Sequence, residues 1–253
     1  KHELSDARWW PVAEALPLAH EAIDIWTREL GPQHPRMVTA LSNLAVFAKR
    51  NADYDDAMAL ATRALDLSRT LRGEQHPDLG QQYALLASIE NWRGDFVAAA
   101  EHFDRAIAIL AAAGPARVER TAGILLTAAS FRVDAGDLAG AEALLAQAQA
   151  LDLKYPPGHP FWTGEAGTRT QIALARGQLD VAERELQREL AMLTKSEQPD
   201  LLGRLYLALH QAELHLHRGR IDEGLAVLEP VVTLYPRELR HPYNRAQLDF
   251  LRA

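Results

Sequence analysis

A turn signal recurs along this sequence at an almost constant interval. Its central positions are Ala52, Gly94, Gly136, Gly177 and Gly219, which lie 42, 42, 41 and 42 residues apart. Five residues after each of them comes a small residue: Ala57, Ala99, Ala141, Ala182 and Gly224. A small residue at this point lets two helices approach closely, so its recurrence has a packing reason. The sequence therefore predicts copies of one structural unit, each of which buries its apolar side only against the next copy.

The copy formed by residues 35–76 has helical periodicity on both sides of its turn. Apolar or small residues before the turn are Met37, Leu41, Leu44, Ala45 and Ala48, and those after it are Tyr54, Ala57, Met58, Ala61, Ala64, Leu65, Ser68 and Leu71. Such spacing is typical of the buried stripe of an amphipathic helix. Asn51 and Asp53 favour a turn between the two stripes, while Gly73 suits the left-handed end of the second helix. Each copy is thus predicted to be two antiparallel helices, helix A before the turn and helix B after it.

A His-Pro pair marks most of the boundaries between copies. The four histidines are His34, His76, His159 and His241. Proline is favoured in the first turn of a helix, so each pair predicts the start of a helix A. The histidine is expected to cap that helix or to pack on the preceding loop. Because the pairs are spread along the chain, they are not expected to converge on one binding site.

The order of these features resembles the tetratricopeptide repeat: a Leu-rich helix A, Gly-Asp, an aromatic or aliphatic residue, then two alanines. The best copies are residues 41–45 and 93–96, which read Leu-Ser-Asn-Leu-Ala and Arg-Gly-Asp-Phe. Repeats of that family usually have about 34 residues. The longer period here is similar to that of the kinesin light chains and of many bacterial multidomain regulators. The resemblance covers nearly the whole chain and implies an all-α fold, a right-handed solenoid of stacked antiparallel helix pairs.

This reading makes residues 1–253 a single solenoid. Its parts are a partial repeat at 1–34, repeats at 35–76, 77–115, 116–158, 160–197 and 199–239, and a C-terminal capping helix at 240–253. Pro17 lies inside helix B of the partial repeat and is expected to kink it or to set its start. The chain begins at Lys1 in the middle of a repeat, which predicts that it is a segment of a longer protein.

Helix A of the repeat at 160–197 is irregular. It contains Gly164 and Gly167, each of which costs roughly 1 kcal/mol relative to alanine inside a helix. Arg169 and Thr170 also stand where the first full repeat has Leu44 and Ala45. This helix is expected to be the weakest of the array. Sequence drift and a functional widening of a binding groove both remain open as explanations.

Composition excludes several functional classes. The formal net charge is −7 with interspersed charges, whereas a nucleic-acid-binding surface needs a basic stripe. The chain has no cysteine, which excludes disulfides and sites based on cysteine. There is no long uncharged apolar run for a membrane span and no signal-peptide pattern, which weakly favours a cytoplasmic location. No catalytic motif is present, so we expect neither enzymatic activity nor a cofactor or bound metal.

The resemblance places the ligand-binding surface on the A helices, which line the concave groove of such solenoids. The groove positions lie 13, 10, 9, 6, 3 and 2 residues before each turn position. The candidates are Arg8, Thr39, Asn43, Lys49, Arg50, Gln81, Ser88, Asn91, Trp92, Thr127, Ser130, Gln171, His210, Glu213 and His217. The N-terminal part of this set is basic and rich in amides, which suits an acidic or extended peptide. The alternative is a solvated helix face with no ligand.

Three of these candidates, His210, Glu213 and His217, lie on one face of a predicted helix. The two histidines are seven residues apart, hence about 10 Å along the helix axis at a rise of about 1.5 Å per residue. They are therefore not expected to bind one metal ion. A pH-sensitive or hydrogen-bonding part of the groove is the preferred interpretation.

Two functions follow from this reading. The first is a scaffold or sensor region of a larger regulatory protein that binds a protein or peptide in the concave groove. The second is an assembly module that forms a homo-oligomer through its convex back or its N-terminal edge. At that edge Trp9 and Trp10 either are exposed or fold over helix B as a cap.

Overall fold

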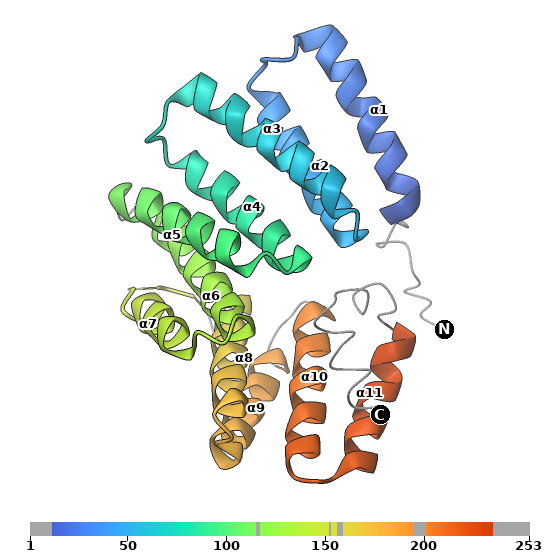
Figure 1. The fold of residues 1–253 in the computed structure, drawn as a ribbon, viewed down its shortest axis with the longest axis vertical. Coiled ribbons are helices and arrows are strands. Elements are labelled where there is room, and N and C mark those ends of the chain that lie inside the picture. Colours follow the sequence, from blue (N-terminus) through green and yellow to red (C-terminus); the bar gives the residue numbers. More distant parts are fainter. Residues whose placement is uncertain (1–11, 115–116, 152, 156–158, 195–200, 235–253) are drawn as a thin grey trace. The chain divides into compact units, whose positions relative to one another are not determined.

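The computed structural model describes residues 12–114, 117–151, 153–155, 159–194 and 201–234 (Figure 1). Within these residues every regular element is a helix, and the chain divides into two compact units between Ile109 and Leu110. Unit 1 contains α1 (Val12–Leu30), α2 (Arg36–Arg50), α3 (Tyr54–Arg72), α4 (Asp78–Arg93) and most of α5 (Phe96–Ala112). Unit 2 contains α6 (Val118–Asp134), α7 (Leu138–Gln149), α8 (Pro160–Ala175), α9 (Leu179–Leu193), α10 (Leu201–His217) and α11 (Ile221–Leu234).

Consecutive helices form the predicted pairs. Helix A and helix B of each repeat are α2 and α3, α4 and α5, α6 and α7, α8 and α9, and α10 and α11. Within each unit a helix B also contacts the next helix A, as α3 does with α4 and α9 with α10. The prediction of an all-α fold of stacked antiparallel helix pairs is confirmed. The arrangement of all repeats in one continuous solenoid stays a prediction, as does the capping helix, which lies outside the described residues.

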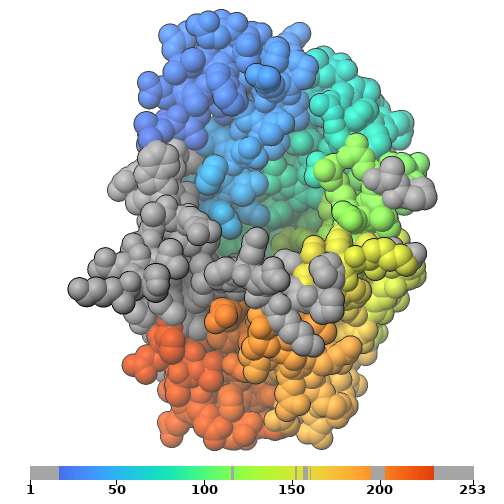
Figure 2. Space-filling model, turned by 180° about the vertical axis from the view of Figure 1, so that it is seen from behind, coloured from blue at the N-terminus to red at the C-terminus, as the bar shows by residue number. Residues whose placement is uncertain are grey.

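The small residues after the turns lie where the helices approach most closely. Ala57, Ala141 and Ala182 are fully buried. A Cβ atom placed on Gly224 would lie 3.2 Å from the backbone oxygen of Ala212 on the facing helix. Leucine and further alanine side chains form the core between α8, α9 and α10 and between α10 and α11. Figure 2 shows the surface of the same chain as a space-filling model coloured along the sequence. The recurrence noted in the sequence therefore reflects close helix packing.

All five turn positions have left-handed backbone conformations. The φ angles are 62° at Ala52, 88° at Gly94, 79° at Gly136, 68° at Gly177 and 72° at Gly219. Ala52 is the only residue other than glycine with a positive φ among those described. A side chain in this region is strained by about 1–2 kcal/mol, because Cβ crowds the following carbonyl oxygen.

We expect Ala52→Gly to raise the free energy of unfolding by about 0.5–1 kcal/mol, since it relieves this strain at a smaller entropic cost in the unfolded chain. Urea unfolding followed by circular dichroism measures the change. The matched control is Ala59→Gly, at an exposed position inside α3, where the same substitution should cost roughly 1 kcal/mol. A loss of stability in both variants would contradict the strain at Ala52.

The His-Pro pairs cap the A helices as expected. The Nδ1 atom of His34 accepts a hydrogen bond from the backbone N–H two residues later at 3.3 Å, and those of His76 and His159 do so at 3.2 Å. His241 lies outside the described residues. Pro17 does not set the start of its helix, because α1 begins at Val12 and continues through it.

A polar cluster ties α3, α4 and α5 together in unit 1. The His102 ring stacks on Tyr83 with ring centroids 5.7 Å apart, and its Nδ1 lies 2.7 Å from Oε2 of the buried Glu90. The Tyr83 hydroxyl accepts a hydrogen bond of 3.0 Å from Nη2 of Arg69. The cluster links three consecutive helices through side chains that are largely shielded from water.

This cluster makes stability depend on pH. The hydrogen bond with Glu90 raises the pKa of His102, and the charges of Glu90 and Glu101 add to the effect. A raised pKa in the folded state contributes stability that is present below the ordinary histidine pKa of about 6.5 and is lost as pH rises through the raised value. We expect Glu90→Gln to lower the urea midpoint more at pH 6 than at pH 8.5. Glu29→Gln, at an exposed site on α1, serves as the control, and equal losses of Glu90→Gln at the two pH values would contradict the linkage.

Candidate partner-binding surface

The A helices of consecutive repeats contact each other through polar side chains. In unit 1 the Ser42 hydroxyl donates to Oε1 of Gln82 over 2.8 Å, and Lys49 Nζ donates to the Ser88 hydroxyl over 2.5 Å. In unit 2 the Ser130 hydroxyl donates to Oε1 of Gln171 over 2.9 Å. Four of the predicted site residues therefore meet in pairs across neighbouring A helices.

We call the predicted positions on α2 and α4 the A face of unit 1. Its members are Thr39, Asn43, Lys49, Arg50, Gln81, Ser88, Asn91 and Trp92. Most of them reach the surface: Thr39, Asn43, Arg50 and Gln81 are exposed, and Lys49, Ser88 and Trp92 are partly buried. Side chains that are exposed on two adjacent helices can contact one extended ligand. Arg8 lies outside the described residues.

Asn91 differs from the rest of the A face because it is only 3% exposed. Neither polar atom of its side chain has a hydrogen-bond partner among the described residues. A buried amide without partners costs about 1–3 kcal/mol, so its presence is not explained by packing alone. A ligand on the surface would not reach this amide in the present conformation.

Lys49 has an unusual environment for a cation. Its Nζ lies 5.5 Å from the centroid of the Trp92 ring as well as against Ser88. Burial, together with the positive charge of Arg50, lowers the pKa of Lys49 to about 8. No carboxylate of the described part of the chain lies within 4.0 Å of Nζ.

Arginines that precede the turns are, in contrast, paired with acids on the preceding helix B. Arg93 lies 3.7 Å from Asp55, Arg218 lies 2.8 Å from Glu183, and Arg176 forms a bidentate contact with Glu142. Exposed ion pairs contribute little stability individually. Their recurrence nevertheless shows that these arginines join neighbouring helices.

In unit 2 the predicted residues on α10 do not form one surface. His217 is exposed, with Nε2 3.9 Å from Oε1 of Glu213, whereas His210 is only 5% exposed. His210 Nδ1 instead faces α9, where Oε2 of Glu189 lies 3.4 Å away. Thr127, on α6, is exposed and donates to the backbone oxygen of Gly123.

Glu189 is a buried residue of the site that the sequence did not predict. Only 1% of it is exposed. It lies 12 residues after the turn position Gly177, where the corresponding residues of three other repeats are Ala64, Ala106 and Ala148. Comparison of this one position between repeats is the signal that would have found it. Among these four repeats, only the one at 160–197 has a buried carboxyl group where the others have a buried methyl group.

The buried Glu189 explains one irregular feature of the α8 sequence, the glycine at position 167. A Cβ atom on Gly167 would lie 3.3 Å from Oε1 of Glu189 and 3.6 Å from Cε1 of His210. The missing side chain of Gly167 therefore provides room for the buried Glu189–His210 pair. Gly167, which was expected to weaken the helix, thus lies next to a buried polar pair that the corresponding positions of other repeats lack.

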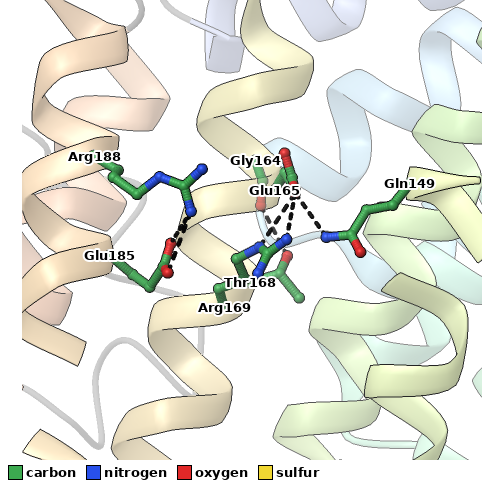
Figure 3. A network of polar contacts seen from close by, with 7 residues as sticks. All are labelled: Gln149, Gly164, Glu165, Thr168, Arg169, Glu185 and Arg188. Carbon is green, nitrogen blue, oxygen red and sulfur yellow. Dashed lines mark hydrogen bonds and ion pairs between the residues drawn. The ribbon is translucent and has the colours of Figure 1, made fainter. Parts of the chain in front are cut away.

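The polar residues of α8 are also bonded to their neighbours (Figure 3). Oε1 of Glu165 accepts hydrogen bonds from Gln149 of α7 at 2.7 Å and from Nη2 of Arg169 at 3.0 Å. The Thr168 hydroxyl donates to the backbone oxygen of Gly164 at 2.9 Å. These contacts connect α7 to α8 and hold Arg169 at the position where the first full repeat has Leu44.

Metal binding and membrane insertion find no support in the described parts of the chain. No three His, Asp or Glu side chains there are grouped so as to hold a metal ion. None of the helices there is both long and apolar enough to span a membrane.

Comparisons with known proteins match the repeats. The sequence profile of the tetratricopeptide repeat matches residues 12–70 and 36–112. The clustered mitochondria protein homolog of Candida albicans is 32% identical over 92 residues, and that of Lodderomyces elongisporus is 31% identical over 101 residues. These matches cover 36% and 37% of this chain. The chain spans only 7% of the length of either relative.

Solved structures with a similar fold include kinesin-light-chain-like proteins. BtubC (BKLC) from P. vanneervenii superimposes with a TM-score of 0.65 at 21% identity, covering 95% of this chain and 93% of BtubC. A putative kinesin light chain from Podosopora anserina with nearly identical repeats gives 0.59 at 21% identity, covering 82% and 98%. The Cut9–Hcn1 hetero-tetramer of the APC/C gives 0.61 at 13% identity, covering 89% of this chain and 39% of that one. At these identities the similarity shows the fold alone.

Proposed function

We propose that this chain, whose residues 12–112 match the sequence profile of the tetratricopeptide repeat, binds a segment of a partner protein on the A helices, without catalysis. The name of one similar structure supports this class of function, because Cut9–Hcn1 is a hetero-tetramer, an assembly of different proteins. The proposed binding region is the A face of unit 1. The chain would then act as a scaffold or sensor region of a larger protein.

One observation carries this proposal: three polar side chains of the A face are exposed and form no hydrogen bond among the described residues. Thr39, Asn43 and Gln81 are exposed, and their side chains form no hydrogen bond with the rest of the described chain. Amide side chains present both donors and acceptors, which match the backbone of an extended peptide. Lys49 and Arg50 add positive charge beside them, which favours acidic residues in that peptide.

Photo-crosslinking with a defined peptide tests the site. Acidic and extended peptides are first selected from a random library on the immobilised chain, and the tightest one is resynthesised with a photoreactive group. We expect crosslinks on exposed residues of α2 and α4, identified by mass spectrometry, and their suppression by excess unlabelled peptide. Crosslinks confined to exposed residues of α3, or labelling that excess peptide does not suppress, would place binding elsewhere.

A second function, self-assembly, is favoured by one feature of α1. This helix exposes several large apolar side chains: Leu18 is 51% exposed, Ile25 41%, Trp26 43% and Leu30 40%. A concentration of large exposed apolar side chains on one helix favours an interaction surface there. Size-exclusion chromatography with light scattering separates the two functions. A molar mass that stays monomeric at all protein concentrations would exclude self-assembly.

A further inference from the structure

Helix α1 differs from the other B helices because no helix A precedes it among the described residues. In the repeats that follow, a helix B contacts the helix A before it and the helix A after it, as α3 does with α2 and α4. α1 contacts α2, which is the helix A after it (Figure 1). Within the described chain, α1 therefore lacks the partner that its own repeat should supply.

Large apolar side chains of α1 are exposed at positions that the next repeats bury. Leu18 is 51% exposed, Ile25 41% and Trp26 43%. The residues 42 positions later in the sequence are at most 8% exposed: Leu60, Leu67 and Ser68. After another 42 residues, Ile109 and Leu110, the counterparts of Ile25 and Trp26, are again buried. These positions of a helix B are therefore packing positions, and on α1 they have no partner among the described residues.

Helix α2 shows the same difference at one position. Phe47 is 38% exposed, whereas its counterparts Ile89, Ile172 and Leu214 in α4, α8 and α10 are at most 6% exposed. Each of those three helices contacts the helix A of the repeat before it, and α2 has no such neighbour among the described residues. One additional helix A would cover the exposed residues of both α1 and α2. We call these residues the α1 face: Leu18, Ile25, Trp26 and Phe47.

Exposed carboxylates accompany the α1 face. Glu21 and Glu29 lie four residues before and four residues after Ile25, hence on the same side of α1. Both are exposed, and neither forms a hydrogen bond or an ion pair with another described residue. From residue 17 to residue 30 the helix has three carboxylates and one arginine. The surface is therefore apolar with a negative charge beside it.

We propose that the α1 face binds a basic amphipathic helix of another protein. This helix lies antiparallel to α1, as a helix A does in the other repeats, and its apolar stripe packs on Ile25, Trp26 and Phe47. Its lysine or arginine side chains pair with Glu21 and Glu29, which selects a basic partner over an acidic one. The α1 face is a second interaction surface, separate from the A face of unit 1, and its ligand has the opposite charge.

Two other occupants match the α1 face less well. In a pair of identical chains joined through α1, the carboxylates Glu21 and Glu29 of both copies would come together, and like charges across an interface are unfavourable. The first residues of this chain also lack the apolar pattern of a helix A. In the sequence, the positions 42 residues before the buried Leu44, Ala45 and Ala48 are polar: His2, Glu3 and Asp6.

A synthetic peptide with the sequence of α2 tests this proposal. Residues 36–50 form a helix A in this chain and include three basic residues and no carboxylate side chain. We expect the fluorescein-labelled peptide to bind the whole chain saturably in fluorescence anisotropy and to gain helicity in circular dichroism. A peptide with its three basic residues replaced by glutamate should bind at least about tenfold more weakly. Absence of saturable binding, or equal affinity for the two peptides, would overturn the proposal.

Substitutions in the α1 face locate the binding site. We expect Trp26→Gln to weaken binding of the α2 peptide at least about tenfold, because it removes the largest apolar side chain of the face. The matched control is Val97→Gln on α5, where Val97 is 77% exposed, and it should keep the affinity within about twofold of the wild type. Both positions are exposed, so both variants should fold. Equal losses in the two variants would contradict the assignment to α1.

Charge reversal tests the role of the carboxylates. Glu21→Lys combined with Glu29→Lys is expected to reverse the preference, so that the glutamate peptide binds more tightly than the α2 peptide. Glu101→Lys combined with Asp222→Lys changes two exposed carboxylates outside α1 by the same total charge and serves as the control. A preference that stays unchanged in the α1 variant, or that reverses in the control as well, would refute electrostatic selection by this face.

Two further measurements separate the α1 face from other sites and occupants. The acidic peptide selected for the A face and the α2 peptide should bind the chain at the same time, and competition between them would place the α2 peptide on the A face. Failure of the A face to bind its acidic peptide would leave the assignment of the α1 face unaffected. Light scattering that detects a wild-type dimer but a Trp26→Gln monomer would assign the α1 face to a second copy and overturn the proposal.

Discussion

Replacement of His210 by alanine is expected to lower the free energy of unfolding by about 3 kcal/mol. The loss is large because Glu189, only 1% exposed, then keeps its buried carboxyl group without the imidazole partner. Removal of one member of a buried pair typically costs 3–5 kcal/mol. Urea unfolding of the single variant and the wild type gives the difference.

The matched variant is Glu189→Ala with His210→Leu, which installs the apolar residues found at the corresponding positions of the first two full repeats, Ala64 and Leu85. Replacement of a whole buried polar pair is often neutral or stabilising. We therefore expect the double variant to be more stable than His210→Ala by at least about 2 kcal/mol. A single variant that loses less than about 1 kcal/mol would mean that the Glu189 carboxyl group reaches water on its own.

Asn43→Ala combined with Arg50→Glu is expected to weaken binding of the selected peptide at least tenfold, about 1.4 kcal/mol. The first change removes an exposed amide from the A face, and the second reverses a charge that favours an acidic ligand. Both residues are exposed, so the melting temperature should fall by no more than a few degrees. Fluorescence anisotropy measures affinity, and circular dichroism measures melting.

Arg63→Glu is the control for this charge reversal, because Arg63 is exposed on helix B and lies outside the A face. It should leave peptide affinity within about twofold of the wild type. Affinity that is unchanged in the Asn43→Ala, Arg50→Glu variant would refute the assignment of the A face. A similar loss in the Arg63→Glu control would indicate a general electrostatic effect.

The repeated features were predictable because each is local. A turn needs a left-handed residue, a helix pair needs a small residue where its members approach, and a helix needs a cap. These needs recur in each repeat, so Gly94, Ala99 and His76 can be recognised by counting. Ala52 fitted the count despite being an unfavourable residue for its conformation.

The site was less predictable because exposure depends on residues far away in the sequence. Groove positions were assigned by their distance from the turn, and this rule placed Asn43 and Gln81 on the surface. The same rule selected Asn91 and His210, which neighbouring helices bury. Helical periodicity alone does not distinguish an exposed glutamate from a buried one such as Glu189. The binding role of every candidate remains a prediction.

The close approach at Gly224 limits how such chains can change during evolution. Its neighbour across the interface is a backbone oxygen, which cannot rotate away as a flexible side chain can. Substitutions that enlarge this position or its counterparts should therefore be eliminated in related sequences, whereas exposed positions on the A helices can vary and acquire new partners. Divergence among relatives should thus be concentrated on the surface that selects the partner, while the spacing that assembles the repeats stays fixed.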